Sequence, residues 1–156
     1  GNVVLSYVIN LVTGEEFWAE KGKGAFRNGE RIRTQGDDIF YLAAYEASTP
    51  AKDVPTILPV LSKARKTRCF GATALSLCYL ATGAVSVLLI PSPSRSFDFA
   101  GGWLIVKEAG GVVTDLGGND IGHVRLGVNK ATPVLASANE KVHREALKLL
   151  KNSLKA

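Results

Sequence analysis

A change in the pattern of secondary-structure signals near residues 34–38 limits the possible folds of this 156-residue chain most strongly. Before it, the sequence predicts short strands joined by tight turns: residues 3–12 form a β-branched run, and Asn28-Gly29 between two short runs is a strong hairpin signal. After it, apolar runs of strand length alternate with runs of helical period. The first part therefore predicts an antiparallel meander, and the second predicts a strand–helix sheet domain.

The second part can be divided further. The runs there predict strands at residues 39–47, 67–70, 84–90, 112–114 and 133–138, and helices at residues 54–63, 72–82, 98–109 and 139–155. A loop is expected at residues 91–94, which read Pro-Ser-Pro-Ser. We therefore expect a layered α/β (α+β) fold, with a hairpin domain at residues 1–36 and an α/β domain at residues 37–156.

Composition excludes several classes of protein. With 46% apolar and 21% charged residues, the chain has the balance of a soluble globular domain. Its apolar runs, such as residues 85–90, are far shorter than the about 20 residues of a membrane helix, so no membrane partner is expected. No signal peptide is evident, and Cys69 and Cys78 are predicted to be buried thiols, which indicates a cytoplasmic protein. The chain lacks methionine and begins Gly-Asn, so we expect a product of processing or a part of something longer.

The formal net charge of +5 is compatible with anionic partners, although a basic, solvated face is the simpler explanation of charge alone. A nucleic-acid module is a weaker alternative, because no recognised nucleic-acid fold or interleaved aromatic platform is present, and no nucleic-acid partner is expected. Between Asp53 and Glu108 the chain carries six basic residues and one acid, Asp98. A single carboxylate in such surroundings is a candidate functional group.

Asp98 is predicted at the start of a helix. There it could cap free backbone amides, or it could ligate a hard cation. Arg95, three residues earlier, would then face the same cleft as a phosphate contact. The small residues Ala100, Gly101 and Gly102 allow close packing of the first helical turn, which a cap alone does not require.

Gly71, Ala72 and Thr73 lie at a predicted strand-to-helix turn. Free amides at such a turn can bind anions or hydroxyl groups, although a glycine that only permits tight packing is the simpler interpretation of this segment alone. The glycine pair at residues 110–111 is interpreted as a structural helix end, and residues 115–119 as a turn. Neither histidine is a candidate, with His123 expected in a loop and His143 on the solvent side of the last helix.

In this order, the segments resemble the inositol monophosphatase superfamily, which includes the archaeal-type fructose-1,6-bisphosphatases. The resemblance covers nearly the whole chain. It is carried by residues 19–29 (AEKGKGAFRNG), 68–75 (RCFGATAL), 81–83 (ATG), 97–102 (FDFAGG) and 108–115 (EAGGVVTD).

The resemblance implies a Mg²⁺-dependent phosphomonoesterase that acts on fructose-1,6-bisphosphate, inositol-1-phosphate or both. Asp98 matches a catalytic metal ligand of the family, and Gly71, Ala72 and Thr73 match residues that face the sugar hydroxyls. The metals would activate a water molecule and stabilise the leaving group. Homodimers are common in the family, and an exposed first strand would favour pairing.

The chain also departs from the family pattern. The glutamate and the Asp-Pro-x-Asp-Gly segment that supply the family's other metal ligands are absent, so the chain corresponds to a C-terminal portion, with residues 1–36 as a remnant of the N-terminal sheet domain. Ile90 stands where inositol-selective members carry a sugar-binding glutamate, and Ser86 and Phe97 replace an aspartate and a tryptophan that are common in the family. We therefore expect part of a sugar or inositol phosphatase that is inactive in isolation. The alternative is a naturally short, non-catalytic paralogue used for binding or assembly.

Overall fold

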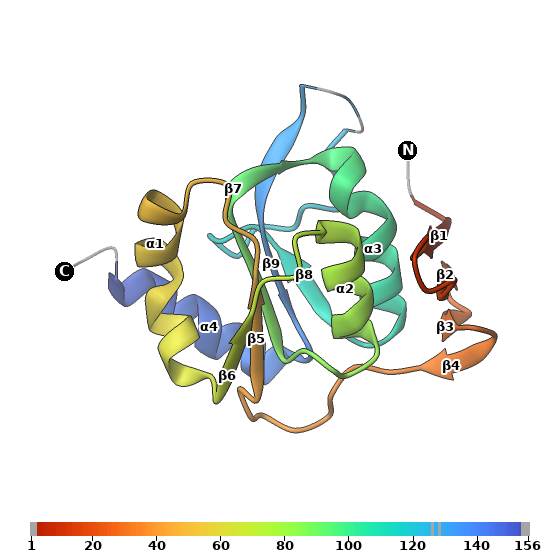
Figure 1. Ribbon diagram of the computed structural model, residues 1–156, viewed down its shortest axis with the longest axis horizontal. Coiled ribbons are helices and arrows are strands. Elements are labelled where there is room, and N and C mark those ends of the chain that lie inside the picture. The colour runs from red at the N-terminus through yellow and green to blue at the C-terminus, as the bar shows by residue number, and fades with distance from the viewer. Residues whose placement is uncertain (1–2, 126, 128, 154–156) are drawn as a thin grey trace.

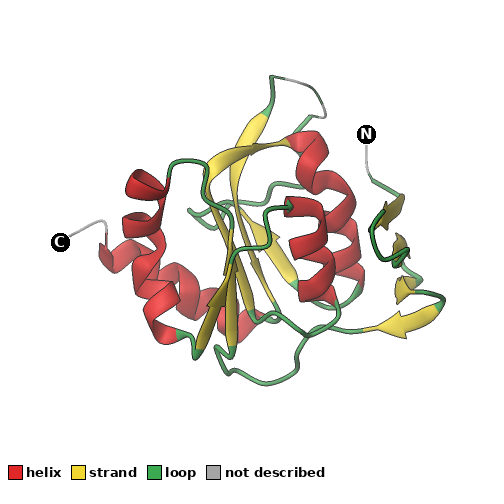
Figure 2. Ribbon diagram, in the orientation of Figure 1, coloured by secondary structure: helices red, strands yellow, loops and turns green. Residues whose placement is uncertain are grey.

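A computed structural model describes residues 3–125, 127 and 129–153, and over these residues the chain forms two sheets and four helices in stacked layers (Figures 1 and 2). The strands are β1 (Leu5–Ile9), β2 (Glu16–Glu20), β3 (Gly24–Arg27), β4 (Glu30–Ile32), β5 (Leu42–Tyr45), β6 (Lys66–Arg68), β7 (Val87–Arg95), β8 (Val112–Thr114) and β9 (Ala131–Ser137). The helices are α1 (Pro50–Lys63), α2 (Thr73–Ala81), α3 (Ser96–Glu108) and α4 (Glu140–Ser153). The expected layered α/β class is confirmed.

Strands β1 to β4 form an antiparallel sheet in chain order, called the N-terminal sheet below. Its last hairpin turns at Asn28 and Gly29, whose φ angles of 49° and 82° suit the turn that joins two strands with native twist. The predicted meander and its Asn-Gly hairpin are therefore confirmed.

The C-terminal sheet has the strand order β6-β5-β7-β9-β8. Strand β5 runs parallel to both β6 and β7, whereas β9 runs antiparallel to β7 and β8. Because β5, β6 and β7 are parallel, the residues that follow them lie at the same end of the sheet. This arrangement brings the candidate residues together.

The prediction of a loop at residues 91–94 is wrong, because strand β7 continues through these residues to Arg95. Strand β7 pairs with β9 up to Ile90 and again from Ser94, with a shift in register between them. Pro91 and Pro93 lie in this irregular stretch, where a missing backbone donor interrupts no regular ladder. Pairing with a strand more than thirty residues away thus extends β7 beyond its local signals.

Helix α3 lies between the sheets and contacts strands of both (Figure 1). Phe17, Ala19 and Ala25 on the N-terminal sheet are buried in the core that α2 and α3 share with one face of the C-terminal sheet. Helices α2 and α3 approach closely at Gly102, where a Cβ atom would lie 2.5 Å from the Leu77 Cβ atom. The close packing expected of the small residues after Asp98 is thus present.

Helices α1 and α4 cover the other face of the C-terminal sheet (Figure 2). As the helical period predicts, one face of α4 is buried through Val142, Ala146 and Leu150. Residues 154 and 155, the end of the helix expected from the sequence, lie outside the described residues.

The solvent-facing position expected for His143 is wrong, because this residue is only 3% exposed. Its ring nitrogens lie 3.0 Å from the hydroxyl oxygens of Thr114 and Ser137. The sheet hydroxyls satisfy the imidazole, so it occupies a buried position of an amphipathic helix. Burial lowers the pKa of His143 from its ordinary value.

Cys78 is buried as expected, and burial raises its pKa to about 12. The same expectation is wrong for Cys69, which is exposed because β6 forms an edge of the C-terminal sheet and Cys69 follows its end.

The proposed domain division between residues 36 and 37 falls between β4 and β5 and remains a prediction. None of the helices in the described part of the chain is long and apolar enough to span a membrane.

Candidate functional site

The candidate residues gather at the end of the C-terminal sheet where β5, β6 and β7 finish. Glu46 follows β5, Gly71 follows β6, and Asp98 lies two residues after the first residue of α3, which begins directly after β7. Helices α2 and α3 pack side by side and both begin at this end (Figure 1). Their free N-terminal amides therefore face the same region, which favours anions and hydroxyl groups.

Asp98 lies in the first turn of α3 with an exposed side chain. No described residue makes a hydrogen bond to its carboxylate, and the helix shows no side-chain cap among the described residues. Ser96 holds the start of α3 instead: its hydroxyl oxygen accepts a hydrogen bond from the Gly127 amide at 3.0 Å, and its own amide donates to the Lys130 carbonyl at 2.8 Å. Within the described part of the chain, Asp98 therefore does not act as a cap, and its exposed carboxylate remains a candidate ligand.

Gly71 has a φ of 76°, a conformation that favours glycine, and no atom lies within 4 Å of the position that a Cβ would take. The requirement is thus for backbone conformation, not for space. Ala72 and Thr73 follow at the start of α2, both half-buried. The strand-to-helix turn predicted from the sequence is therefore present, and its substrate role stays a prediction.

Glu46 is a residue of this site that sequence reasoning missed. Its carboxylate accepts hydrogen bonds from the Gly71 amide at 3.0 and 3.2 Å and from the Ser76 hydroxyl at 2.8 Å. A negative charge thus already sits at the start of α2 and fixes the turn at Gly71. The Cys69 thiol lies 3.5 Å from the same carboxylate, and its pKa is raised, mainly by partial desolvation of the sulfur and then by the charge of Glu46.

Occupation of the Gly71 amide by Glu46 has a consequence for ligand orientation. A phosphate group placed at the start of α2 would meet this carboxylate and be repelled, whereas a hydroxyl group could hydrogen-bond to it. The start of α2 is therefore better suited to a hydroxyl group than to an anion.

Arg95 is exposed at the end of β7. Its guanidinium carbon lies 5.8 Å from the centre of the Phe97 ring, which is itself exposed. Arg95 therefore flanks the first turn of α3 together with Asp98. Its contact with phosphate remains a prediction.

The described residues include no group of three or more His, Cys, Asp or Glu side chains that could hold a metal ion. Asp98 offers one carboxylate, whereas a Mg²⁺ ion held by protein takes oxygen ligands at octahedral geometry, commonly from one or two carboxylates, substrate phosphate and water. These residues alone therefore do not fit a two-metal centre.

Two segments that carry the family resemblance contact each other away from this region. Glu108, the last residue of α3, accepts hydrogen bonds from the Gly22 amide at 2.8 Å and from the Gly24 amide at 2.9 Å. Both glycines have positive φ angles, 80° and 96°. Glu108 thus fastens the β2–β3 hairpin to α3 and has a structural role.

Comparison with known proteins identifies the family. The sequence profile of the inositol monophosphatase family matches residues 1–155. The chain is 35% identical over 148 residues to the fructose-1,6-bisphosphatase/inositol-1-monophosphatase of Archaeoglobus fulgidus, a match that covers 93% of this chain and 54% of that protein. It is also 34% identical over 151 residues to the bifunctional NADP phosphatase/NAD kinase of Methanococcus maripaludis, covering 93% of this chain and 26% of that protein.

The fold gives the same result. The Thermotoga maritima IMPase superposes with a TM-score of 0.83 at 29% identity, covering 99% of this chain and 58% of that chain. The chain belongs to the inositol monophosphatase family. It spans about half the length of the fructose-1,6-bisphosphatase/inositol-1-monophosphatases that it matches.

Proposed function

We propose that this chain is part of a Mg²⁺-dependent phosphomonoesterase that hydrolyses sugar or inositol phosphates, fructose-1,6-bisphosphate and inositol-1-phosphate among them. The main support is the position of Asp98: an exposed carboxylate without a described hydrogen-bond partner, at the same sheet end as the turn at Gly71. Asp98 would ligate the metal, Arg95 would contact the phosphate, and residues 71–73 would face the sugar.

The isolated 156-residue chain is proposed to be inactive, because one carboxylate cannot replace a complete ligand set. The test is an assay of inorganic phosphate release by the purified chain with Mg²⁺. The name of the Methanococcus relative adds NADP to fructose-1,6-bisphosphate and inositol-1-phosphate as a substrate to include. Release at the rate of an ordinary enzyme would contradict the proposed inactivity.

The role of Asp98 is tested in the complete protein by Asp98→Asn. We expect kcat/KM to fall by about a hundredfold or more, with an unchanged unfolding midpoint, because no described group bonds to this carboxylate. Asp38→Asn is the matched control: Asp38 is an exposed carboxylate paired with Lys141 and precedes β5, at the opposite end of that strand. A loss smaller than about tenfold for Asp98→Asn would contradict the proposed role.

A naturally short, non-catalytic paralogue remains the second candidate, because a match to about half of the relatives' length does not distinguish it from a part of a longer enzyme. Complete loss of phosphatase activity in the whole gene product would support it.

We also propose a homodimer, which light scattering of the complete protein can test. A cytoplasmic location is proposed as well, in agreement with the unpaired cysteines Cys69 and Cys78. Cell fractionation can test that location.

A further inference from the structure

The carboxylate of Glu46 lies against the turn at Gly71 and keeps acceptor capacity for a ligand. Its Oε1 atom accepts from the Ser76 hydroxyl at 2.8 Å, and the Gly71 amide is shared between Oε1 and Oε2 at 3.2 and 3.0 Å. An ionised carboxylate has about four acceptor positions and donates nothing. Glu46 is half-buried and Gly71 is exposed, so a group that donates a hydrogen bond can reach this carboxylate from solvent.

The charge of Glu46 is not balanced by an ion pair among the described residues. Arg68, the last residue of β6, directs its guanidinium to the Thr67 carbonyl at 2.8 Å instead. The same charge contributes to the raised pKa of the Cys69 thiol, after partial desolvation of the sulfur. A ligand at this turn therefore meets a negative charge, which attracts the dipole of a hydroxyl group and repels a phosphate group.

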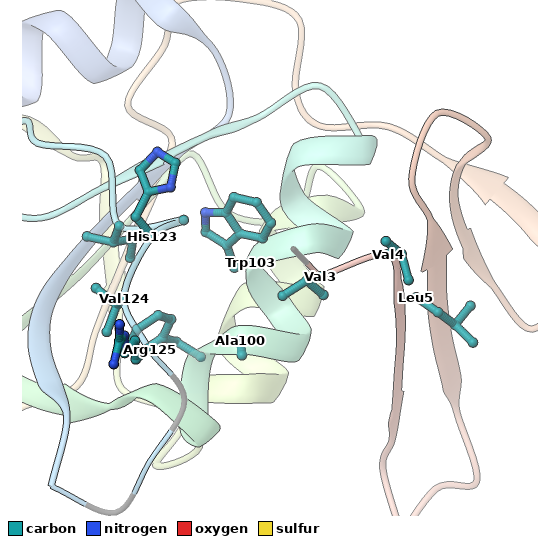
Figure 3. A pocket seen from close by; sticks show the side chains of 11 residues that line it. Val3, Val4, Leu5, Ala100, Trp103, His123, Val124 and Arg125 are labelled. Atoms are coloured by element: carbon teal, nitrogen blue, oxygen red, sulfur yellow. The ribbon is translucent and has the colours of Figure 1, made fainter. Parts of the chain in front are cut away.

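A pocket of about 760 Å³ beside α3 has a different lining (Figure 3). It lies between residues 3–5, helix α3 and the loop at residues 121–125. Phe99, which follows Asp98 directly, forms part of its wall, and Arg125 adds a positive charge. No Asp or Glu is among the described residues that line it. A carboxylate that can accept from a substrate hydroxyl is therefore found at the start of α2 and not in this pocket.

We propose that Glu46 is a specificity-determining residue, which accepts a hydrogen bond from a substrate hydroxyl and repels a second phosphate group. This inference rests on the proposed phosphatase function and narrows its substrate class to monophosphates of sugars and cyclic polyols, in preference to sugar bisphosphates. The cleaved phosphate lies near Asp98, and the part of the substrate that bears hydroxyl groups lies at residues 71–73. A second phosphate on that part lies next to the Glu46 carboxylate.

The first test compares two substrates that differ in one group, fructose-1-phosphate and fructose-1,6-bisphosphate. Loss of the C1 phosphate is followed in the complete protein with Mg²⁺ as fructose or fructose-6-phosphate formed. The unmodified protein should have a kcat/KM about tenfold or more higher for the monophosphate. Glu46→Gln should move the ratio of the two values toward the bisphosphate by about tenfold. Partial unfolding of the variant would lower both values equally, so this ratio reports on specificity and not on stability.

Two matched variants separate the charge of Glu46 from other effects. Ser76→Ala removes one donor to Glu46 and keeps its charge, so the ratio should stay within about twofold of the unmodified value. Glu140→Gln removes an exposed carboxylate from the first turn of α4. Helix α4 begins at the opposite end of the C-terminal sheet, because β9, which precedes it, runs antiparallel to β7. Glu140→Gln should therefore leave both kcat/KM values within about twofold.

Alkylation of Cys69 reports on ligands at the same turn without any hydrolysis. The rate of its reaction with iodoacetamide, an uncharged reagent, is measured in the complete protein by mass spectrometry of the peptide that contains Cys69. Addition of about 50 mM myo-inositol should slow the reaction about twofold or more, as for a dissociation constant of about 50 mM or tighter. Inorganic phosphate at the same concentration should leave the rate unchanged. In Glu46→Gln, myo-inositol should lose its effect on the rate.

Three results would overturn the proposal. The first is a preference of the unmodified protein for the bisphosphate. The second is a ratio that Glu46→Gln leaves within about twofold of the unmodified value. The third is alkylation of Cys69 that myo-inositol does not slow. If the complete protein hydrolyses neither fructose substrate, the phosphatase proposal fails, and the alkylation rates then decide alone whether Glu46 binds a hydroxyl group.

Discussion

Replacing Glu108 with alanine should loosen the β2–β3 hairpin from α3. Glu108 accepts two hydrogen bonds, from Gly22 at 2.8 Å and from Gly24 at 2.9 Å. Hydrogen bonds to charged groups are worth about 1.5–3 kcal/mol when buried. Both contacts are partly open to solvent, so we take about 1 kcal/mol for each and expect a loss of about 2 kcal/mol.

The position of Glu108 makes the sign of this effect informative. It is the last residue of α3, where a negative charge interacts unfavourably with the helix dipole by about 0.3–1 kcal/mol. If the glycine contacts contributed nothing, Glu108→Ala would therefore stabilise the protein slightly. A clear destabilisation can come only from the contacts with the hairpin or from the loss of side-chain packing.

The measurement is urea unfolding followed by circular dichroism, together with the thermal midpoint. A loss of about 2 kcal/mol corresponds to a fall of about 4–8 °C for a chain of this size. Glu108→Gln keeps the packing but turns an amide donor toward one backbone amide, so it should lose about half as much or more. Glu20→Ala is the control on the same hairpin, because its ion pair with Lys23 is exposed and worth less than about 1 kcal/mol.

The reasoning would be refuted if Glu108→Ala lay within about 0.5 kcal/mol of the unmodified chain. Equal losses for Glu108→Ala and Glu20→Ala would refute it as well. Faster amide exchange confined to Gly22 and Gly24 in the Glu108 variants would locate the effect at the hairpin.

Three further predictions concern the interior and the thiols. Because burial lowers the pKa of His143, the stability that its neutral ring contributes is complete above the unfolded pKa near 6.5. This stability is lost as the pH falls, by up to about 1.4 kcal/mol per pH unit, until the folded pKa is reached. Urea unfolding at pH 7.5, 6.5 and 5.5 measures the loss, and His143→Gln should reduce the dependence of the unfolding free energy on pH. Gly102→Ala should destabilise the protein by about 1–3 kcal/mol, because its Cβ would lie 2.5 Å from the Leu77 Cβ. Gly101→Ala is the control and should be nearly neutral, because its Cβ would lie 3.3 Å from one Val8 methyl group. Equal unfolding midpoints for the two variants would contradict the close approach of α2 and α3 at Gly102. A disulfide reagent at pH 8 should modify exposed Cys69 and spare buried Cys78 in the folded chain. Glu46→Gln should speed the reaction of Cys69, because it removes a charge that raises the pKa of this thiol. A slower reaction in that variant would contradict the contact between Cys69 and Glu46.

The layered fold could be predicted from the sequence because its signals are local. The Asn28-Gly29 turn and the period of α4 are each read within a few neighbouring residues. The continuation of β7 past Pro91 could not be read in this way, because it depends on pairing with β9. His143 was misplaced for a similar reason: its partners, Thr114 and Ser137, come from two strands of the C-terminal sheet.

The residues of the candidate site also differ in whether local sequence signals or distant contacts identify them. Asp98 and Gly71 are candidates on the evidence of adjacent residues alone, namely a lone acid at a helix start and a glycine between a strand and a helix, and their roles stay predictions. Glu46 was missed because its partner Gly71 is 25 residues away and only the parallel pairing of β5 with β6 brings them together. An acidic residue directly after a buried strand was the one available signal.

The placement of α3 between the two sheets sets a limit on how its sequence can vary. Phe99, Leu104 and Ile105 are buried, and the helix contacts strands on both sides. A substitution along most of α3 must therefore be compatible with two neighbouring surfaces at once. Helix α4, by contrast, has one buried face and one face that is exposed to solvent. Sequence drift should therefore accumulate faster in α4 than in α3, so the helix that carries Asp98 has less freedom to change than α4.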